Sequence, residues 1–427
     1  MKQSSISRSF ARSRDKKDPL RKYRRRFYRP GRAIYMDGNS LGLCSRDAKK
    51  TLMKHWTAWK RQGIGGWLNA DPPWFTLGEN LGRLAAPLVG ACPDELVAAG
   101  STTVNIHALL SGFYRPEGNR RKLLVDALNF PTDLYAAAGQ IRLHGSDPET
   151  DLIRVQPADG VLLAEEEIIR NMNEEVAVAL LPSVLYRSGQ LLDMKRLAKA
   201  AHDRKILIGF DCSHSAGIVD HRLHDWGVDF AMWCSYKYMN GGPGSIAFLF
   251  VHRKNFERVP LMTGWWGYVK NRQFDMLPRF EPQRGAAGWQ ISTPGVFSAS
   301  PLEGSLQILA EAGIRNIRHK SLALTGYLME LFDAWIGTSH DMRIVTPREP
   351  LKRGGHVALE HKQAWKICQA LKSRGVIPDF RPPSIIRLAP SALYISFDDV
   401  RTVMHRLRRI MDTRAYRAFS GRRDAVS

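Results

Sequence analysis

The sequence predicts an α/β protein with a largely parallel sheet, followed by a smaller second domain. Three short apolar segments, partly β-branched, lie at residues 122–126, 176–181 and 206–211. Apolar runs of this length are typical of parallel strands that are buried on both faces. Between the last two, residues 193–204 place apolar side chains at helical spacing. This pattern indicates a strand–helix–strand crossover.

Other elements are expected on both sides of that crossover. A short apolar run at 33–36 ends in turn-forming residues and precedes a helix that places Leu52, Trp56 and Trp59 on one face. Further strands are expected at 230–233, 246–251, 385–388 and 393–396, with mostly helical chain after residue 300. The predicted domains are a basic arm at 1–32, a large domain at 33–300 and a small domain with a basic tail at 301–427.

The net charge of +22 is concentrated at the two ends of the chain. Residues 1–32 contain 13 Lys and Arg against 2 acidic residues, and residues 401–427 contain 8 against 2. The intervening chain is almost balanced, with 42 against 37. Such blocks are most often solvated tails or helix faces, with binding to polyanions, acidic lipids or a partner as the alternative. The Ser/Arg-rich stretch 4–14 resembles a mitochondrial presequence only weakly.

Cysteine usage and hydropathy indicate an intracellular compartment. The five cysteines are scattered and form no C-x-x-C pair, so we expect reduced thiols, no disulfide framework and no metal site. No stretch approaches the roughly 18 consecutive apolar residues of a membrane span. The N-terminus lacks the apolar core of a secretory signal. We therefore expect a cytoplasmic protein that does not cross a membrane.

An aspartate and a lysine follow two of the predicted strands. Asp211 ends the segment 206–211, and Lys237 lies between the strand 230–233 and the glycine-rich loop 240–244. Ligands of open α/β sheets bind beyond the carboxyl ends of the strands. Pyridoxal 5′-phosphate (PLP) requires a carboxylate beside its pyridine nitrogen and a lysine that forms a Schiff base. The pair therefore predicts a PLP enzyme with Lys237 as the Schiff-base lysine.

A third signal is Gly-Ser-Thr-Thr at 100–103, directly before an apolar helix that begins near Val104. Small hydroxyl residues at a helix N-terminus cap the helix and also bind phosphate. Each signal alone has an ordinary structural explanation: a turn aspartate, a surface lysine or a helix cap. Their order and spacing together favour one cofactor site.

Seven segments resemble the kynureninase family: Tyr35–Gly42, Thr102–His107, Asn129–Asp133, His224–Asp229, Trp233–Asn240, Gly264–Gly267 and Ile386–Pro390. The resemblance extends from about residue 33 to residue 398 and is most specific at 224–229 and 233–240. It implies fold type I of the PLP enzymes, which class-V aminotransferases and cysteine desulfurases share. That fold has a large domain with a mostly parallel seven-stranded sheet and a smaller α+β domain.

The resemblance also implies the residues of the site. Lys237 and Tyr236 would be catalytic, with Tyr236 as a proton donor or a phosphate ligand. The cofactor contacts would be Thr102, Thr103, Phe130, Asp133, Asp211, His214, Tyr236, Lys237 and, from the neighbouring subunit of a homodimer with shared active sites, Trp265 and Thr293. Arg387 would bind the α-carboxylate of the substrate, because its planar fork suits that group. Asn39 and Trp67 would be further substrate contacts.

The implied reaction is hydrolysis of the Cβ–Cγ bond of L-kynurenine to anthranilate and L-alanine. Its setting would be tryptophan catabolism, the kynurenine pathway towards NAD, or a derived biosynthetic pathway. Trp67 and Thr293 match the bacterial pattern, which favours L-kynurenine over 3-hydroxykynurenine. Pro182 replaces a usual hydroxyl residue and Tyr268 a frequent histidine, which leaves a ring-substituted kynurenine open as substrate.

Two other functions remain as alternatives at this point. Another fold-type-I activity, a desulfurase or an aminotransferase, is the first. A desulfurase needs a cysteine on a mobile loop, and the C-terminal half offers only Cys368, within an apparently helical segment. Nucleic-acid binding through the basic ends is the second. No zinc-finger spacing, aromatic-basic RNA signature or helix-turn-helix accompanies those ends.

Overall fold

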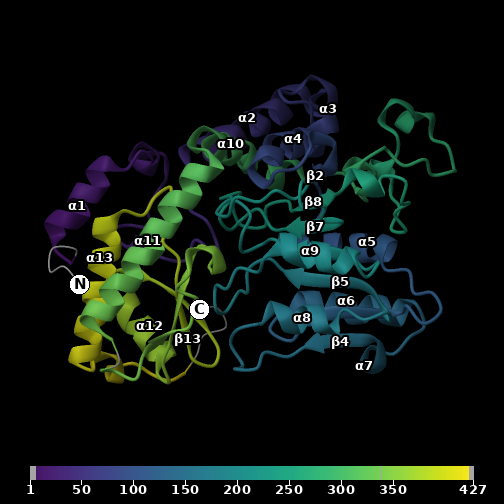
Figure 1. Ribbon diagram of the computed structural model, residues 1–427. Coiled ribbons are helices and arrows are strands. Elements are labelled where there is room, and N and C mark those ends of the chain that lie inside the picture. Colours follow the sequence, from purple (N-terminus) through teal and green to yellow (C-terminus); the bar gives the residue numbers. More distant parts are fainter. Residues whose placement is uncertain (1–5, 338, 423–427) are drawn as a thin grey trace.

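The computed structural model describes residues 6–337 and 339–422, and a seven-stranded sheet dominates it (Figure 1). The strand order is β2-β8-β7-β6-β5-β3-β4. The five strands β3 to β7 all run in the same direction. Strand β8 is antiparallel to both of its neighbours, β2 and β7. The strand bounds are β2 Leu96–Ala98, β3 Lys122–Asp126, β4 Leu152–Val155, β5 Val176–Pro182, β6 Leu207–Asp211, β7 Phe230–Trp233 and β8 Phe248–Val251. The prediction of a largely parallel sheet is confirmed.

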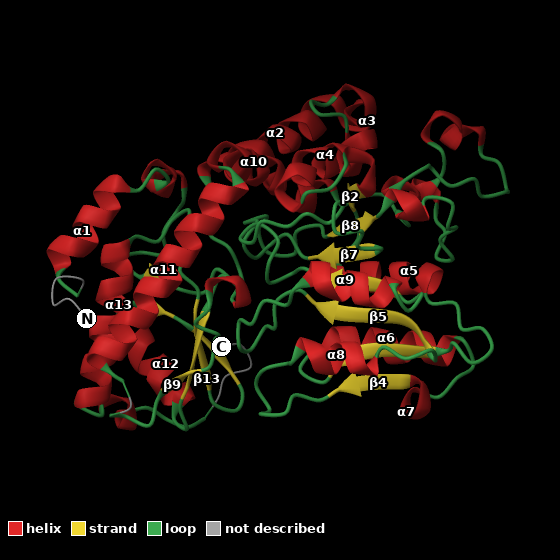
Figure 2. Ribbon diagram, in the orientation of Figure 1, coloured by secondary structure: helices red, strands yellow, loops and turns green. Residues whose placement is uncertain are grey.

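Helices cover both faces of this sheet (Figure 2), which explains the continuous apolar runs of its strands. Along β3, Leu123 and Val125 belong to the core beneath one helical layer, while Leu124 belongs to the core on the other face. The helices are α5 Thr102–Phe113 and α6 Pro131–Leu143 on the first face, and α8 Glu165–Asn171 and α9 Met194–His202 on the second, with the short α7 Pro148–Asp151 at one edge.

A second, four-stranded antiparallel sheet has the order β12-β13-β10-β9. Its strands are β9 Arg343–Ile344, β10 Val357–Glu360, β12 Asp379–Arg381 and β13 Ile385–Leu388. The helices of this C-terminal part of the chain are α11 Ile314–Trp335, α12 Ala364–Lys372 and α13 Phe397–Asp412. The strand expected at 393–396 is wrong. Tyr394 and Ile395 both donate backbone hydrogen bonds to the carbonyl of Ser391, so this apolar segment is a buried turn.

A group of four helices lies along the β2 edge of the large sheet (Figure 1): α2 Arg46–Gln62, α3 Gly66–Asn69, α4 Leu77–Val89 and α10 Val296–Ala312. Helix α2 turns Ala48, Thr51 and His55 towards the protein. Its approach to α10 is close, because a Cβ on Gly304 would lie 2.4 Å from the backbone of Asp47. The aromatic face noted in the sequence is not the buried one: Trp56 is 48 % exposed.

The basic N-terminal arm is folded onto the C-terminal part of the chain from residue 6 onwards. Helix α1 (Arg8–Lys17) packs against α13. The Asp15 carboxylate accepts backbone hydrogen bonds from Phe397 (2.7 Å) and Asp398 (3.1 Å), and so caps the first turn of α13. A buried ion pair between Asp18 and Lys320 (2.7 Å) fastens the arm to α11.

After the arm, β1 (Ile34–Tyr35) pairs in parallel with β11 (Val376–Ile377). This pairing brings the turn at Asp37–Ser40 towards the small sheet. Residues 1–5 of the arm and 423–427 of the basic tail lie outside the described residues. In the described part of the chain, no helix combines the length and the apolar character that crossing a membrane requires.

Candidate active site

A cavity of about 210 Å³ lies beyond the carboxyl ends of β6 and β7. Strand β6 contributes Asp211 there, and the turns that follow the two strands contribute His214 and Lys237. This position is where an open α/β sheet binds its ligands. The lining residues are Asn39, Ser40, Thr102, Thr103, Phe130, Thr132, Tyr186, Asp211, Ser213, His214, Tyr236, Lys237, Arg381 and Arg387.

The Lys237 side chain is part of this cavity wall. Its Nζ is 3.0 Å from Nε2 of His214 and 6.0 Å from the centre of the Phe130 ring. Burial and the charge of Lys237 hold the pKa of His214 well below its usual range, so the imidazole is neutral. A neutral ring with its proton on Nδ1 accepts a hydrogen bond from the amine at Nε2. His214 therefore orients Lys237 without competing for positive charge.

The carboxyl groups of the buried Asp126 and Asp133 and of the half-buried Asp211 lie near one another. The backbone N–H of Ser213 donates to Oδ1 of Asp211 at 2.7 Å, which fixes that carboxylate. Burial and the nearby charge of Asp211 raise the pKa of Asp133 well above its usual range. Burial also raises the pKa of Asp126 to about 7. When Asp133 is uncharged, no second negative charge lies beside Asp211.

The N-terminus of α5 forms the anion-binding end of the cavity. Thr102 and Thr103 occupy its first turn, and Oγ1 of Thr103 lies 3.0 Å from Oγ1 of Thr132. Ser101, the residue at the N-cap, makes no side-chain hydrogen bond to this turn within the described chain. The N–H groups of the first turn are therefore available to a phosphate, and the helix dipole favours its charge. Gly100 adopts a φ of +50°, which the turn into the helix requires.

Arg387, on strand β13, also lines the cavity. Its side chain is buried, with Nη1 donating to the carbonyl of Tyr186 (2.7 Å) and Nη2 to Oγ of Ser40 (3.1 Å). Its Nε donates to the buried carboxylate of Asp379. Arg381 also donates to Asp379, at 3.1 Å. Two guanidinium groups thus share the Asp379 carboxylate, and burial beside Asp379 raises the pKa of the nearby Asp37 to about 6. Arg381 and Arg387 both line the cavity, where guanidinium groups suit an anionic group of a ligand.

Sequence reasoning missed Asp379, Arg381 and Ser40. Asp379 and Arg381 are two residues apart on β12, so they lie on the same face of that strand. The register places Asp379 opposite Arg387 on β13. Alternation along the strand was readable from the sequence, but the pairing of two strands in this register was not.

Four predicted residues do not line the cavity of the single chain. Asp133 is completely buried and is not part of the cavity wall. Trp67 packs in an aromatic group, with ring centres 5.7 Å from Trp74 and 5.4 Å from Trp266. Trp265 is 47 % exposed and Thr293 is also exposed. Trp265 and Thr293 were expected to act from a neighbouring subunit, and the single chain does not complete that part of the site.

The residues of the cavity fit PLP. Within the described residues, Nδ1 of His214 and the amide of Asn39 are buried in the cavity wall without a hydrogen-bond partner. Buried polar atoms of this kind indicate a polar ligand, because their desolvation is costly when nothing binds them. A phosphate fits the α5 end, a pyridine nitrogen fits Asp211, and an aldehyde carbon fits the Lys237 amine.

Comparison with known proteins finds relatives that match over nearly the whole chain. The chain is 53 % identical to kynureninase of Geobacillus thermodenitrificans, over 98 % of this chain and 97 % of the relative. It is 50 % identical to kynureninase of Shouchella clausii, over 99 % of both. The chain belongs to the kynureninase family. The model of the kynureninase C-terminal domain also matches, at residues 317–407. Kynureninases are PLP-dependent hydrolases of a C–C bond, and the prediction of this family, activity and cofactor is confirmed.

Solved structures support the fold. An apo cysteine desulfurase from Thermococcus onnurineus superposes with a TM-score of 0.77 at 15 % identity, covering 92 % of this chain and 98 % of that one. C-DES with glycine covalently linked to its PLP cofactor also reaches 0.77. These likenesses confirm fold type I and nothing about the reaction. The kynureninase fold in this chain also buries Cys368 completely within α12, where it cannot act as the mobile cysteine of a desulfurase.

Proposed function

We propose that this kynureninase holds PLP through Lys237 and hydrolyses L-kynurenine to anthranilate and L-alanine with the residues of this one cavity. The observation that carries the proposal is that Lys237 and Arg387 line the same cavity although they come from different sheets. Thr102, Thr103 and Tyr236 would hold the phosphate, Phe130 would stack on the ring, and Asp211 would pair with the ring nitrogen.

Each residue then has a defined task in the reaction. When bound, PLP draws electrons away from the bonds at the substrate Cα. Arg387 binds the α-carboxylate and fixes Cα near Lys237, whose amine moves the Cα proton. Burial raises the pKa of Tyr236 above its usual value, so the phenol keeps its proton at neutral pH and can donate it. One water adds to the γ-carbonyl, and the Cβ–Cγ bond breaks to give the two products.

We also propose that the unsubstituted substrate is preferred, because Trp67 and Thr293 follow the bacterial pattern. We expect kcat/KM for L-kynurenine to exceed that for 3-hydroxykynurenine by about 10- to 100-fold, the range that pocket contacts with one hydroxyl can provide. The double variant Trp67→His with Thr293→Asn should reduce this ratio. Steady-state kinetics with both substrates decides the point, and a higher kcat/KM for the hydroxylated substrate in the unaltered enzyme refutes it.

We also propose the division into domains and the homodimer that the sequence analysis predicts. The arm at 1–32, the large domain at 33–300 and the small domain at 301–427 would form one subunit of a cytoplasmic homodimer. The exposure of Trp265 and Thr293 supports a dimer in which each subunit contributes to the site of the other. The five cysteines are free in this structure, which suits a reducing compartment.

Shared sites make a specific prediction for mixed dimers. Lys237→Ala removes the lysine, and Trp265→Ala with Thr293→Ala removes the contacts from the neighbouring subunit. When equal amounts of these two inactive proteins exchange subunits, half the dimers are hybrids with one intact site each, so activity should return to about a quarter of the unmutated level. Native mass spectrometry confirms the exchange. Hybrids that form without any gain in activity would show that the sites are not shared.

A further inference from the structure

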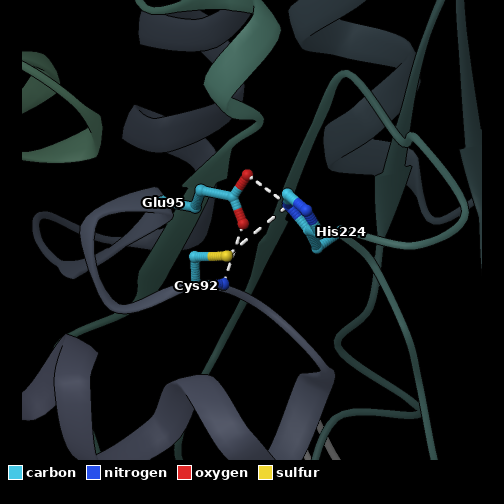
Figure 3. Close-up of side chains that lie close together, drawn as sticks. All are labelled: Cys92, Glu95 and His224. Carbon is cyan, nitrogen blue, oxygen red and sulfur yellow. Dashed lines mark hydrogen bonds and ion pairs between the residues drawn. The ribbon is translucent and has the colours of Figure 1, made fainter.

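The side chains of Cys92, Glu95 and His224 form a cluster of three groups that could bind a metal ion (Figure 3). Glu95 directly precedes β2, His224 lies in the loop before β7, and Cys92 lies at the start of the short turn that leads to Glu95. Strands β2 and β7 run in the same direction, since both are antiparallel to β8. The cluster therefore lies at their amino ends, whereas Asp211 and Lys237 lie at the carboxyl edge.

The distances in the cluster are close to those of a tetrahedral site. Sγ of Cys92 is 3.6 Å from Nδ1 of His224. Zinc bonds to sulfur and nitrogen place these two atoms about 3.5 Å apart in a tetrahedron. Oε1 of Glu95 lies 2.8 Å from the same nitrogen, against about 3.3 Å for a zinc-bound pair. All three ligand atoms lie within 4.8 Å of one another, so small side-chain shifts suffice to bind an ion.

The surroundings hold two of the ligands in place. Glu95 is completely buried, and its carboxylate accepts backbone hydrogen bonds from Cys92 (2.8 Å) and Arg253 (2.9 Å). The His224 ring stacks on His252, with centres 4.9 Å apart and planes within 5°. The His224 side chain is 37 % exposed and Cys92 is partly exposed, so water can reach the cluster. Three protein ligands with one open position are a known arrangement for zinc.

We propose that Cys92, Glu95 and His224 bind one Zn²⁺ ion, which links the chain segments at the amino ends of β2 and β7. Binding releases the thiol proton of Cys92, and the His224 ring transfers its proton from Nδ1 to Nε2 through solvent and stays neutral. The thiolate and the carboxylate then balance the two charges of the ion. Because the cluster lies across the sheet from Lys237, the ion would stabilise the fold without entering the reaction. The cysteine and the histidine are 132 residues apart, so no sequence spacing reveals the site.

Metal titration of the PLP-loaded enzyme, freed of metal by a chelator and carrying no histidine tag, tests this proposal. In competition with a chromophoric chelator, Zn²⁺ should bind at one equivalent per chain. The bound ion should raise the Tm of the enzyme by about 2 °C or more. Co²⁺ difference spectra should show a thiolate-to-cobalt absorption band. Cys92→Ser should lose this band and at least tenfold in affinity, with kcat unchanged, and His224→Gln should weaken binding similarly.

The exposed Cys44 provides the matched control, since Cys44→Ser should keep both the band and the affinity. The isosteric Cys92→Ser change keeps the test valid even when His224→Gln folds poorly. Failure to bind one equivalent would overturn the proposal and leave the cluster as a hydrogen-bonded pair of His224 with Glu95. Unchanged binding in Cys92→Ser, or loss of binding in Cys44→Ser, would overturn it equally.

Discussion

Replacing Lys237 with alanine should lower kcat for anthranilate formation by at least about 10³-fold. The variant loses the covalent bond to the cofactor and the group that moves the Cα proton, and a positioned acid–base group alone contributes about 10²- to 10⁴-fold. His214 cannot replace the lysine efficiently, because its low pKa makes it a weak base. The measurement is anthranilate fluorescence under saturating L-kynurenine.

Two controls accompany that measurement. Lys199→Ala removes a lysine that is 75 % exposed on α9 and should leave kcat unchanged. Borohydride reduction followed by peptide mass spectrometry should find PLP on Lys237 in the unmutated enzyme and on no lysine in Lys237→Ala. Covalently bound PLP in the variant, or near-normal kcat, would mean that another lysine serves the reaction.

Replacing Arg387 with lysine should reduce kcat/KM for L-kynurenine by about 10²- to 10³-fold, the effect of breaking a buried, hydrogen-bonded charge pair. An ammonium group cannot contact Asp379, Ser40 and a substrate carboxylate together as the guanidinium does. The loss should appear mainly as a higher KM, because binding of the α-carboxylate is what the change removes. Asp379→Asn should also reduce kcat/KM for L-kynurenine, but by a smaller factor, because Arg381 and Arg387 both remain.

Arg343→Lys on the neighbouring part of the same sheet is the matched control. Arg343 is 66 % exposed and pairs with Glu360, so this change should leave KM unaltered. Titration of each protein with PLP, followed by absorbance, separates substrate binding from cofactor binding. An unchanged KM in Arg387→Lys, or an equal loss in Arg343→Lys, would assign the α-carboxylate to another group.

Local patterns in the sequence predicted the five inner strands of the large sheet, because these strands are buried and stand out as apolar runs. The two edge strands were missed: β2 has only three residues, and β4 includes the exposed Arg154. The segments 122–126 and 230–233 coincide with β3 and β7. The segment 393–396 was mistaken for a strand, because a buried turn and a buried strand need equally apolar side chains. The docking of the basic arm was not predictable, since Asp15 acts on α13 almost 400 residues later.

Some residues of the candidate site could be predicted from local sequence patterns, and others could not. Lys237, Asp211 and the threonines of α5 follow strands or begin a helix, so their chemistry is visible in short motifs. Arg381 and Asp379 gain their role from the register between β12 and β13, which no local pattern encodes. Trp265 and Thr293 depend on a second subunit, so neither the sequence pattern nor one chain can complete their environment.

The central claim is that this chain cleaves L-kynurenine between Cβ and Cγ in the cavity that contains Lys237 and Arg387. Product analysis of the PLP-loaded enzyme with L-kynurenine, quantifying anthranilate and L-alanine by chromatography, tests it most directly. We expect the two products in equal amounts, with neither formed by Lys237→Ala. Consumption of L-kynurenine without anthranilate, or sulfide release from L-cysteine in its place, would contradict it.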